Sequence, residues 1–138
     1  MPTLTAAATI LLVKDVPHSA NWYKDKLGFS ILKMYGTGAA FIERDGFVIM
    51  LQGTHEPSRI IPNWKMADKT SNIYFWTDDV ETLYKEFIAS GATIDFTLYA
   101  TPWGTKEFGI NDPDEYDITF GQVLQPQSNL FPRTASNG

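Results

Sequence analysis

The chain of 138 residues contains no cysteine and only two histidines, His18 and His55. The absence of cysteine excludes disulfides, thiolate metal sites and cysteine nucleophiles. His18 is expected in the first turn of a helix and His55 in a connecting segment, so both are interpreted as exposed side chains. Serine hydrolase, phosphate-loop and dinucleotide-binding fingerprints are also missing, because no glycine-rich turn leads from a strand into a helix.

Basic residues are outnumbered, with 11 Lys and Arg against 16 Asp and Glu and a formal net charge of −5. Without a basic field to hold phosphates, nucleic-acid binding is not expected. The longest nearly apolar run, residues 6–13, is too short to cross a bilayer, and no basic segment precedes it as a signal peptide requires. We therefore expect a soluble cytoplasmic protein with no membrane partner.

Hydrophobic residues make up 43% of the chain, which is enough for the core of one domain of this length. The aromatic residues are 9 Phe, 6 Tyr and 4 Trp. This content is typical of an aromatic-rich core, but it also fits a stacking cavity or a large interface.

The first half of the chain predicts one β-α-β-β-β module at about residues 5–53. A strand at 9–13 is followed by a helix that Asp15 caps and Gly28 ends, with apolar residues at helical spacing. Three strands are then expected, at 30–35, 39–43 and 47–52. The last two are joined through Asp45-Gly46, which is a strong signal for a tight hairpin.

The second half repeats this plan at about residues 72–122. A strand at 72–77 precedes a helix that Asp79 caps and Gly91 ends, and three strands follow at 93–99, 105–110 and 116–121. Residues 54–71 are interpreted as a connector in which Trp64 anchors the loop. Residues 126–138 are predicted to be a mobile tail, so that residues 1–125 form a single domain.

Because the two halves can be overlaid with few gaps, the sequence predicts an α+β fold of two tandem β-α-β-β-β modules. One helix is expected to cover one face of each module's sheet. The opposite faces are then free to pair, and we expect a curved mixed sheet with an open trough that can hold a ligand.

The chain resembles the vicinal oxygen chelate superfamily, which contains glyoxalases, bleomycin-resistance proteins and extradiol dioxygenases. The resemblance runs from residue 9 to residue 122, and its most specific pieces are residues 12–16, residues 22–29 and the closing stretch from Trp103-Gly104 to Phe120. It implies the two-module fold, but not one activity, since this scaffold serves isomerases, dioxygenases, transferases and binders without chemistry. Glu115 stands where the family usually has a glycine after the Asp-Pro-Asp turn.

Metal-dependent members of this family take one ligand from each of four strands. The resemblance places these ligands at Ala8, Met50, Asn72 and Thr119, none of which is a strong ligand for a catalytic divalent ion. Neither a metal site nor another cofactor is therefore expected.

Strand alternation indicates which side chains face the trough, since residues two apart share a face. Tyr74 and Trp76 are expected there, and Trp103 at the trough's mouth. The two tryptophans could stack a planar ligand or pack at a dimer seam. The side chains expected to bind a ligand are Ile10, Met50, Gln52, Asn72, Trp76, Trp103 and Thr119.

Two functions remain open. The first is a metal-free binding protein of the bleomycin-resistance type, a homodimer that confers antibiotic resistance by sequestering an aromatic or cationic small molecule beside the dimer seam. The second is a glyoxalase-like isomerase or lyase with a non-standard or absent metal site, in which Glu107 and Asp117 are the candidate bases. An accessory domain with a vestigial trough is a third possibility.

Overall fold

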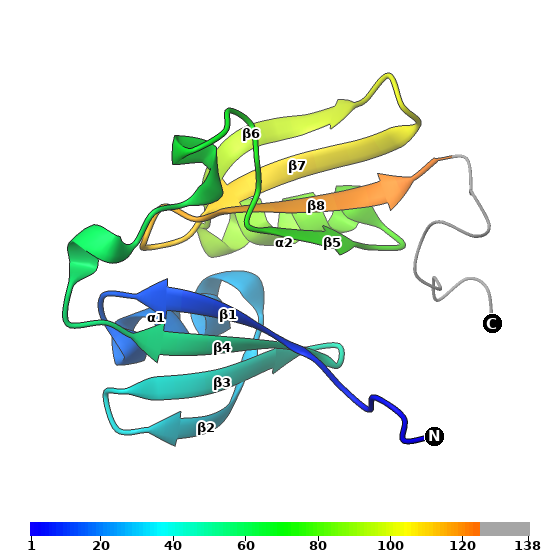
Figure 1. Cartoon of the computed structure of the whole chain (residues 1–138). Helices are drawn as coiled ribbons and strands as arrows, with labels where there is room; N and C mark the ends of the chain where they lie inside the picture. The colour runs from blue at the N-terminus through cyan, green and yellow to red at the C-terminus, as the bar shows by residue number, and fades with distance from the viewer. Residues whose placement is uncertain (125–138) are drawn as a thin grey trace. The chain divides into compact units, whose positions relative to one another are not determined.

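Two β-α-β-β-β modules follow each other along the chain in a computed structural model that describes residues 1–124 (Figure 1). They belong to two units, Met1–Ile61 and Pro62–Gly138, called the first and second unit below. The prediction of an α+β fold with two tandem modules is confirmed. A single domain over residues 1–125 and a trough between the modules stay predictions, and the predicted tail lies outside the described residues.

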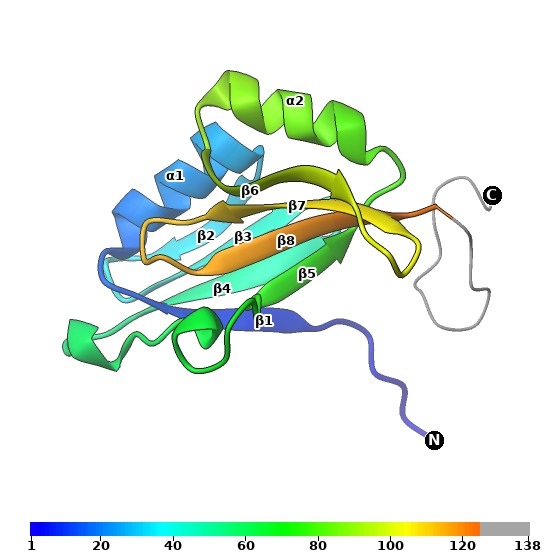
Figure 2. The same cartoon turned by 90° about the horizontal axis from the view of Figure 1, so that it is seen from above.

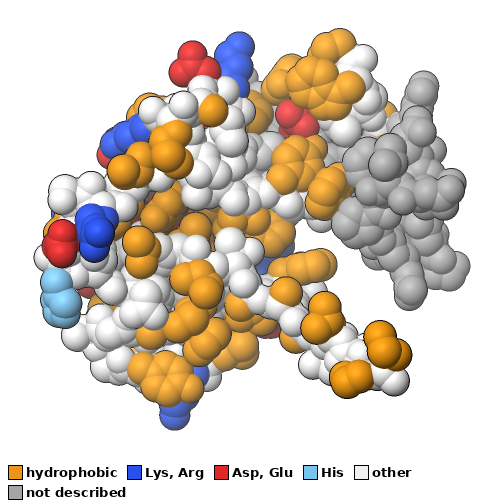
Figure 3. Space-filling view, in the orientation of Figure 1, with side chains coloured by type: hydrophobic (Ala, Val, Ile, Leu, Met, Phe, Trp, Pro, Cys, Tyr) orange, Lys and Arg blue, Asp and Glu red, His pale blue; other side chains and the backbone are white. Residues whose placement is uncertain are grey.

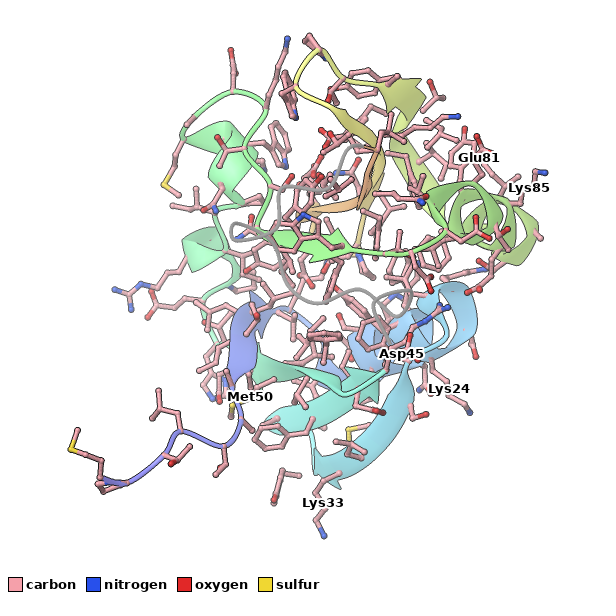
Figure 4. All side chains as sticks on the ribbon, turned by 90° about the vertical axis from the view of Figure 1, so that its right-hand side faces the viewer. Lys24, Lys33, Asp45, Met50, Glu81 and Lys85 are labelled. Carbon is pink, nitrogen blue, oxygen red and sulfur yellow. The ribbon has the colours of Figure 1, made fainter. Side chains whose placement is uncertain are left out.

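The sheet of the first unit has the order β1-β4-β3-β2, in which β1 and β4 are parallel and the other pairs antiparallel. Its elements are β1 (Ala8–Val13), α1 (Val16–Leu27), β2 (Ser30–Tyr35), β3 (Ala39–Arg44) and β4 (Phe47–Gly53). Asp45 and Gly46 form the turn between β3 and β4 with φ of 52° and 87° (Figure 4). Positive φ at both central residues is what a two-residue hairpin turn needs, so this prediction is confirmed.

The sheet of the second unit has the equivalent order β5-β8-β7-β6, with β5 and β8 parallel. Its elements are β5 (Ile73–Trp76), α2 (Val80–Ser90), β6 (Thr93–Ala100), β7 (Thr105–Asn111) and β8 (Asp117–Val123). The connector before β5 contains two short 3₁₀ turns, Pro57–Arg59 and Asn63–Lys65. Two register shifts interrupt the pairing of β6 with β7, and one of them lies between Ile94 and Phe96.

Both helices begin and end where the sequence indicates. The side chains of Asp15 and Asp79 accept hydrogen bonds from the backbone N–H of His18 and Thr82, which are otherwise unpaired at a helix start. Gly28 and Gly91 close the helices with φ of 73° and 82°, a conformation that costs glycine little. The predicted helix boundaries are therefore confirmed.

Each helix packs on one face of its own sheet (Figure 2). In the second unit this contact is aromatic: Phe87 of α2 meets Phe108 and Phe120 in edge-on geometry, and Phe120 stacks on Phe75. In the first unit the buried face is aliphatic, with Ile42, Ile49 and Leu51 fully buried. Because the core side chains lie on the face that the helix covers, the side chains on the opposite face of each sheet are not part of this core.

No helix in the described part of the chain is long and apolar enough to span a membrane.

Candidate functional site

The uncovered face of the first sheet is apolar. Ile10 pairs with Met50 across the parallel β1–β4 ladder, and the side chain of Ile10 is 62% exposed. Gln52, next to Met50 on the same face, donates from its amide to the carbonyl of Gly38 at 3.4 Å. Figure 3 shows hydrophobic side chains gathered over this unit, and Figure 4 labels Met50. Three residues expected to bind a ligand therefore lie together on this face.

The uncovered face of the second sheet is polar, and a carboxylate is buried in it. Glu107 on β7 is 7% exposed, and its Oε2 accepts a hydrogen bond from the Tyr74 hydroxyl at 2.7 Å. The Thr105 hydroxyl donates to the same oxygen at 3.1 Å and is itself bonded to Thr101. Burial raises the pKa of Tyr74, and the hydrogen bond to Glu107 raises it further. Tyr74 therefore stays a hydrogen-bond donor at neutral pH.

A glycine provides the room for this contact. Gly121 on β8 lies between β5 and β7, and a Cβ placed on it would stand 2.0 Å from the Tyr74 hydroxyl oxygen. The Tyr74 side chain thus passes over the strand at the one point where no side chain blocks it. Gly109 similarly accommodates the Phe96 ring, which would lie 2.3 Å from an added Cβ.

A second carboxylate cluster lies at the other end of this face, where β8 begins. Asp117 is 6% exposed, and its Oδ1 accepts hydrogen bonds from the hydroxyls of Ser71 at 2.8 Å and Thr119 at 3.0 Å. Ser71 and Thr119 are also in close contact with each other. Thr119, one of the side chains expected to bind a ligand, therefore also belongs to the hydrogen-bond network of Asp117.

Asp95 on β6 forms a proton-sharing pair with Asp117. The hydrogen bond that protonated Asp95 donates to Asp117 is the main cause that raises the pKa of Asp95 to about 7, followed by partial burial and by the Asp117 charge. The two negative charges would repel each other if both carboxyl groups were ionised, so the pair keeps one proton at mildly acidic pH.

This pair makes the stability of the protein depend on pH. Because the pKa of Asp95 is higher folded than unfolded, the folded state binds the extra proton, and stability falls as pH rises from about 4 to about 7. Asp95 is exposed, so the effect is reduced by solvent to about 1 kcal/mol. We expect Asp95→Asn to raise the melting temperature by a few degrees at pH 8 and hardly at pH 5, measured by differential scanning calorimetry.

Asp25→Asn is the matched control, because it removes the same charge from an exposed position on α1. An equal gain for both variants at pH 8 would assign the effect to net charge rather than to the pair.

The Asp95–Asp117 pair lines an open pocket of about 600 Å³ in the second unit. The residues around the pocket are Trp64, Lys69, Thr93, Asp95, Asn111, Asp112, Glu115 and Asp117. Because the lining contains four carboxylate side chains and one lysine, the electrostatic potential in the pocket is negative and attracts cations.

The connector is fastened to the turn between β7 and β8. The Trp64 indole N–H donates to the carbonyl of Glu115 at 2.7 Å, and the Lys65 Nζ lies 3.2 Å from the Glu115 carboxylate. The prediction that Trp64 anchors the loop is confirmed. Glu115 has φ of 69°, so it keeps the left-handed conformation that the family's glycine would adopt.

The other residues expected to bind a ligand lie at different places in the second unit. The Oδ1 of Asn72 accepts from the backbone N–H of Asn63 at 2.9 Å, so Asn72 holds the connector. Trp76 is 40% exposed, and its ring centroid lies 5.0 Å from that of Tyr74. Trp103 lies in the turn between β6 and β7 and is 67% exposed. His18 and His55 are exposed, as expected.

The four family ligand positions do not fit a catalytic divalent ion. Ala8 has no donor atom, Met50 offers only a thioether, and the oxygens of Asn72 and Thr119 already take part in the hydrogen bonds described above. Within residues 1–124, no group of three or more His, Cys, Asp or Glu side chains is placed to hold a metal ion.

Sequence reasoning missed two parts of the site. Asp95 was not considered, because it lies at the register shift between Ile94 and Phe96, where alternation alone does not place a side chain. Ser71 was assigned to the connector and gave no signal. The tyrosine that reaches Glu107 was placed on the correct face, but its partner was not foreseen.

The family model of the Glyoxalase/Bleomycin resistance protein/Dioxygenase superfamily matches residues 5–120. No curated protein matches in sequence.

Three solved structures illustrate the likeness in fold. TioX from Micromonospora sp. ML1 is 23% identical with a TM-score of 0.68, and the match covers 87% of this chain and 99% of that one. The bleomycin-binding protein from Streptomyces verticillus, complexed with copper(II)-bleomycin, is 20% identical with a TM-score of 0.65, covering 91% and 100%. Lactoylglutathione lyase from Agrobacterium tumefaciens is 19% identical with a TM-score of 0.66, covering 88% and 96%. With the family model matching most of its length, the chain belongs to the Glyoxalase/Bleomycin resistance protein/Dioxygenase superfamily.

Proposed function

We propose that the protein is a metal-free binding protein that sequesters an aromatic or cationic small molecule. The observation that carries this proposal is the uncovered face of the second sheet, where Asp95, Glu107 and Asp117 lie on the same face as aromatic rings. Lys106 is the one Lys or Arg on strands β5 to β8, and it pairs on the covered face with Glu81 of α2. Figure 4 labels Glu81 on this helix. Such a face attracts a cation and offers it rings to stack on.

The unsuitable donors at the family's metal positions support binding over metal-dependent catalysis. Sequestration needs affinity only, and aromatic side chains beside a few polar groups are typical of small-molecule sites. The bleomycin-binding protein of similar fold was crystallised with a small molecule, copper(II)-bleomycin. More specifically, we propose that the protein is a cytoplasmic homodimer and that the small molecule it sequesters is an antibiotic.

Tryptophan fluorescence tests the proposal. We expect a saturable change on titration with copper(II)-bleomycin, metal-free bleomycin or a cationic aromatic dye, and a weaker response to an anionic aromatic compound of similar size. Trp76→Phe should remove most of the change, because Trp76 lies on the proposed binding face. Trp22→Phe on α1 is the control and should keep it.

Absence of a saturable response to every compound would contradict the proposal. Light scattering on the same samples reports the oligomeric state, and a monomer at micromolar concentration would overturn the dimer.

An isomerase or lyase is the second candidate, favoured by the Asp95–Asp117 pair. A carboxyl group with a pKa of about 7 can both give and take a proton at neutral pH, which general acid–base catalysis requires. Turnover of lactoylglutathione that is lost in Glu107→Gln or Asp117→Asn but kept in Asp25→Asn would favour the enzyme. Unchanged turnover in both site variants would exclude these carboxylates as bases.

A further inference from the structure

We propose that Glu107 and the rings of Tyr74, Trp76 and Tyr99 seat an organic ammonium group, so that the ligand is an alkylated or protonated amine. This inference rests on the proposed function and narrows the ligand from aromatic or cationic to one chemical class. Each of the four side chains comes from the second unit.

The first argument is the register of the second sheet. Trp76 pairs with Gly121, Gly121 with Glu107, and Glu107 with Tyr99, so these residues form one row across β5, β8, β7 and β6. Neighbouring strands are about 4.8 Å apart, which places the carboxylate between two aromatic residues within a span of about 15 Å. The glycine in the row leaves space above the sheet, into which Tyr74 extends.

The second argument is the missing counter-charge of Glu107. A carboxylate that is 7% exposed is normally paired with a cation, yet Glu107 forms no ion pair with a Lys, Arg or His of residues 1–124. The Oε2 atom of Glu107 accepts the hydrogen bonds from Tyr74 and Thr105. The Oε1 atom accepts no hydrogen bond from residues 1–124. One carboxylate oxygen therefore remains for a ligand.

The third argument is the chemistry of the surrounding rings. Trp76 and Tyr99 are 40% and 42% exposed, so their rings are accessible to a ligand. Tyr99 is paired with Glu107 across β6 and β7, and burial together with the negative charge of Glu107 raises the pKa of Tyr99. Aromatic faces together with a carboxylate are a typical seat for ammonium groups, which need charge compensation but few directed hydrogen bonds.

Choline and 3,3-dimethyl-1-butanol test this directly, because they have the same shape and differ in charge. In the ¹⁵N-labelled full chain, the indole N–H signal of Trp76 is identified with Trp76→Phe and followed in both titrations. We expect choline to bind about tenfold more tightly than the alcohol, which corresponds to about 1.4 kcal/mol. Glu107→Gln should abolish this preference while leaving the weak affinity for the alcohol unchanged.

Glu81→Gln is the matched control, since it removes the same charge from the covered side of the same unit and should keep the preference. Should Glu107→Gln fail to fold, Trp76→Leu replaces it and is expected to weaken choline binding about threefold with little effect on the alcohol. Equal affinity of the wild type for both compounds, or a preference that survives in Glu107→Gln, would overturn the ammonium seat. Binding of a neutral aromatic compound without choline would contradict this inference alone, whereas no binding of any compound would contradict the proposed function too.

Discussion

Replacing Gly121 by alanine is expected to lower the free energy of unfolding by about 2–3 kcal/mol and the melting temperature by about 6–12 °C. The added methyl group would stand 2.0 Å from the Tyr74 hydroxyl oxygen and 2.7 Å from the ring carbon that bears it. The side chain must therefore leave, and its 2.7 Å hydrogen bond to Glu107 is lost. A hydrogen bond to a charged group contributes about 1.5–3 kcal/mol, and the displaced ring also loses buried contacts.

A double-mutant cycle with Tyr74→Leu separates this cause from a general effect of the methyl group. With the tyrosine already gone, Gly121→Ala should cost less than about 0.5 kcal/mol, so the coupling energy equals most of the single-mutant loss. Gly38→Ala is the control, because its added Cβ meets only the Tyr35 carbonyl at an ordinary 3.6 Å. A full penalty for Gly121→Ala in the Tyr74→Leu background would show that the contact with Tyr74 is not responsible.

Replacing Asp112 by alanine is expected to cost about 2–4 kcal/mol of stability in chemical denaturation. The Oδ1 of Asp112 accepts hydrogen bonds from the backbone N–H groups of Asp114 and Tyr116, both at 2.9 Å, and Asp112 is 5% exposed. Alanine leaves both donors without this acceptor, and an unsatisfied buried donor costs about 1–3 kcal/mol. The turn that these bonds hold also sets the pairing of β7 with β8.

Asp112→Asn distinguishes hydrogen bonding from charge, because the amide oxygen still accepts while the charge is gone. It should lose less than about 1 kcal/mol. If the asparagine variant is as unstable as the alanine variant, the negative charge of Asp112 and not its acceptor oxygen stabilises the turn.

The elements of the fold could be predicted because local signals and the internal repeat agree. Asp15 with Gly28 and Asp79 with Gly91 mark the same helix in each half, and each pair lies at the corresponding point of its module. The Asp45-Gly46 turn fixes the hairpin register by itself. These features depend on neighbours in sequence, which one sequence reveals.

The site could be predicted only in part, since its contacts join residues far apart in the chain. Alternation placed Tyr74 and Trp76 on one face, but the route of Tyr74 over Gly121 to Glu107 depends on the register of three strands. Asp95 lies at a register shift, and no periodic pattern specifies where such a shift occurs. Asn72 was expected to face a ligand, and the structure shows that its side-chain oxygen accepts a hydrogen bond from the backbone N–H of Asn63 in the connector.

The parallel pairing of β5 with β8 has a consequence for the order in which the second unit assembles. β7 and β8 are joined by a short turn, so they can pair early in folding. In contrast, α2, β6 and β7 separate β5 from β8 in the sequence, and the pairing of Ile73 with Ile118 closes this long loop. β5 is also the shortest strand, with four residues at the edge of the sheet. We therefore expect Tyr74 and Trp76 to reach Glu107 late in folding, and a molecule bound to both Glu107 and Trp76 to stabilise the pairing of β5 with its sheet.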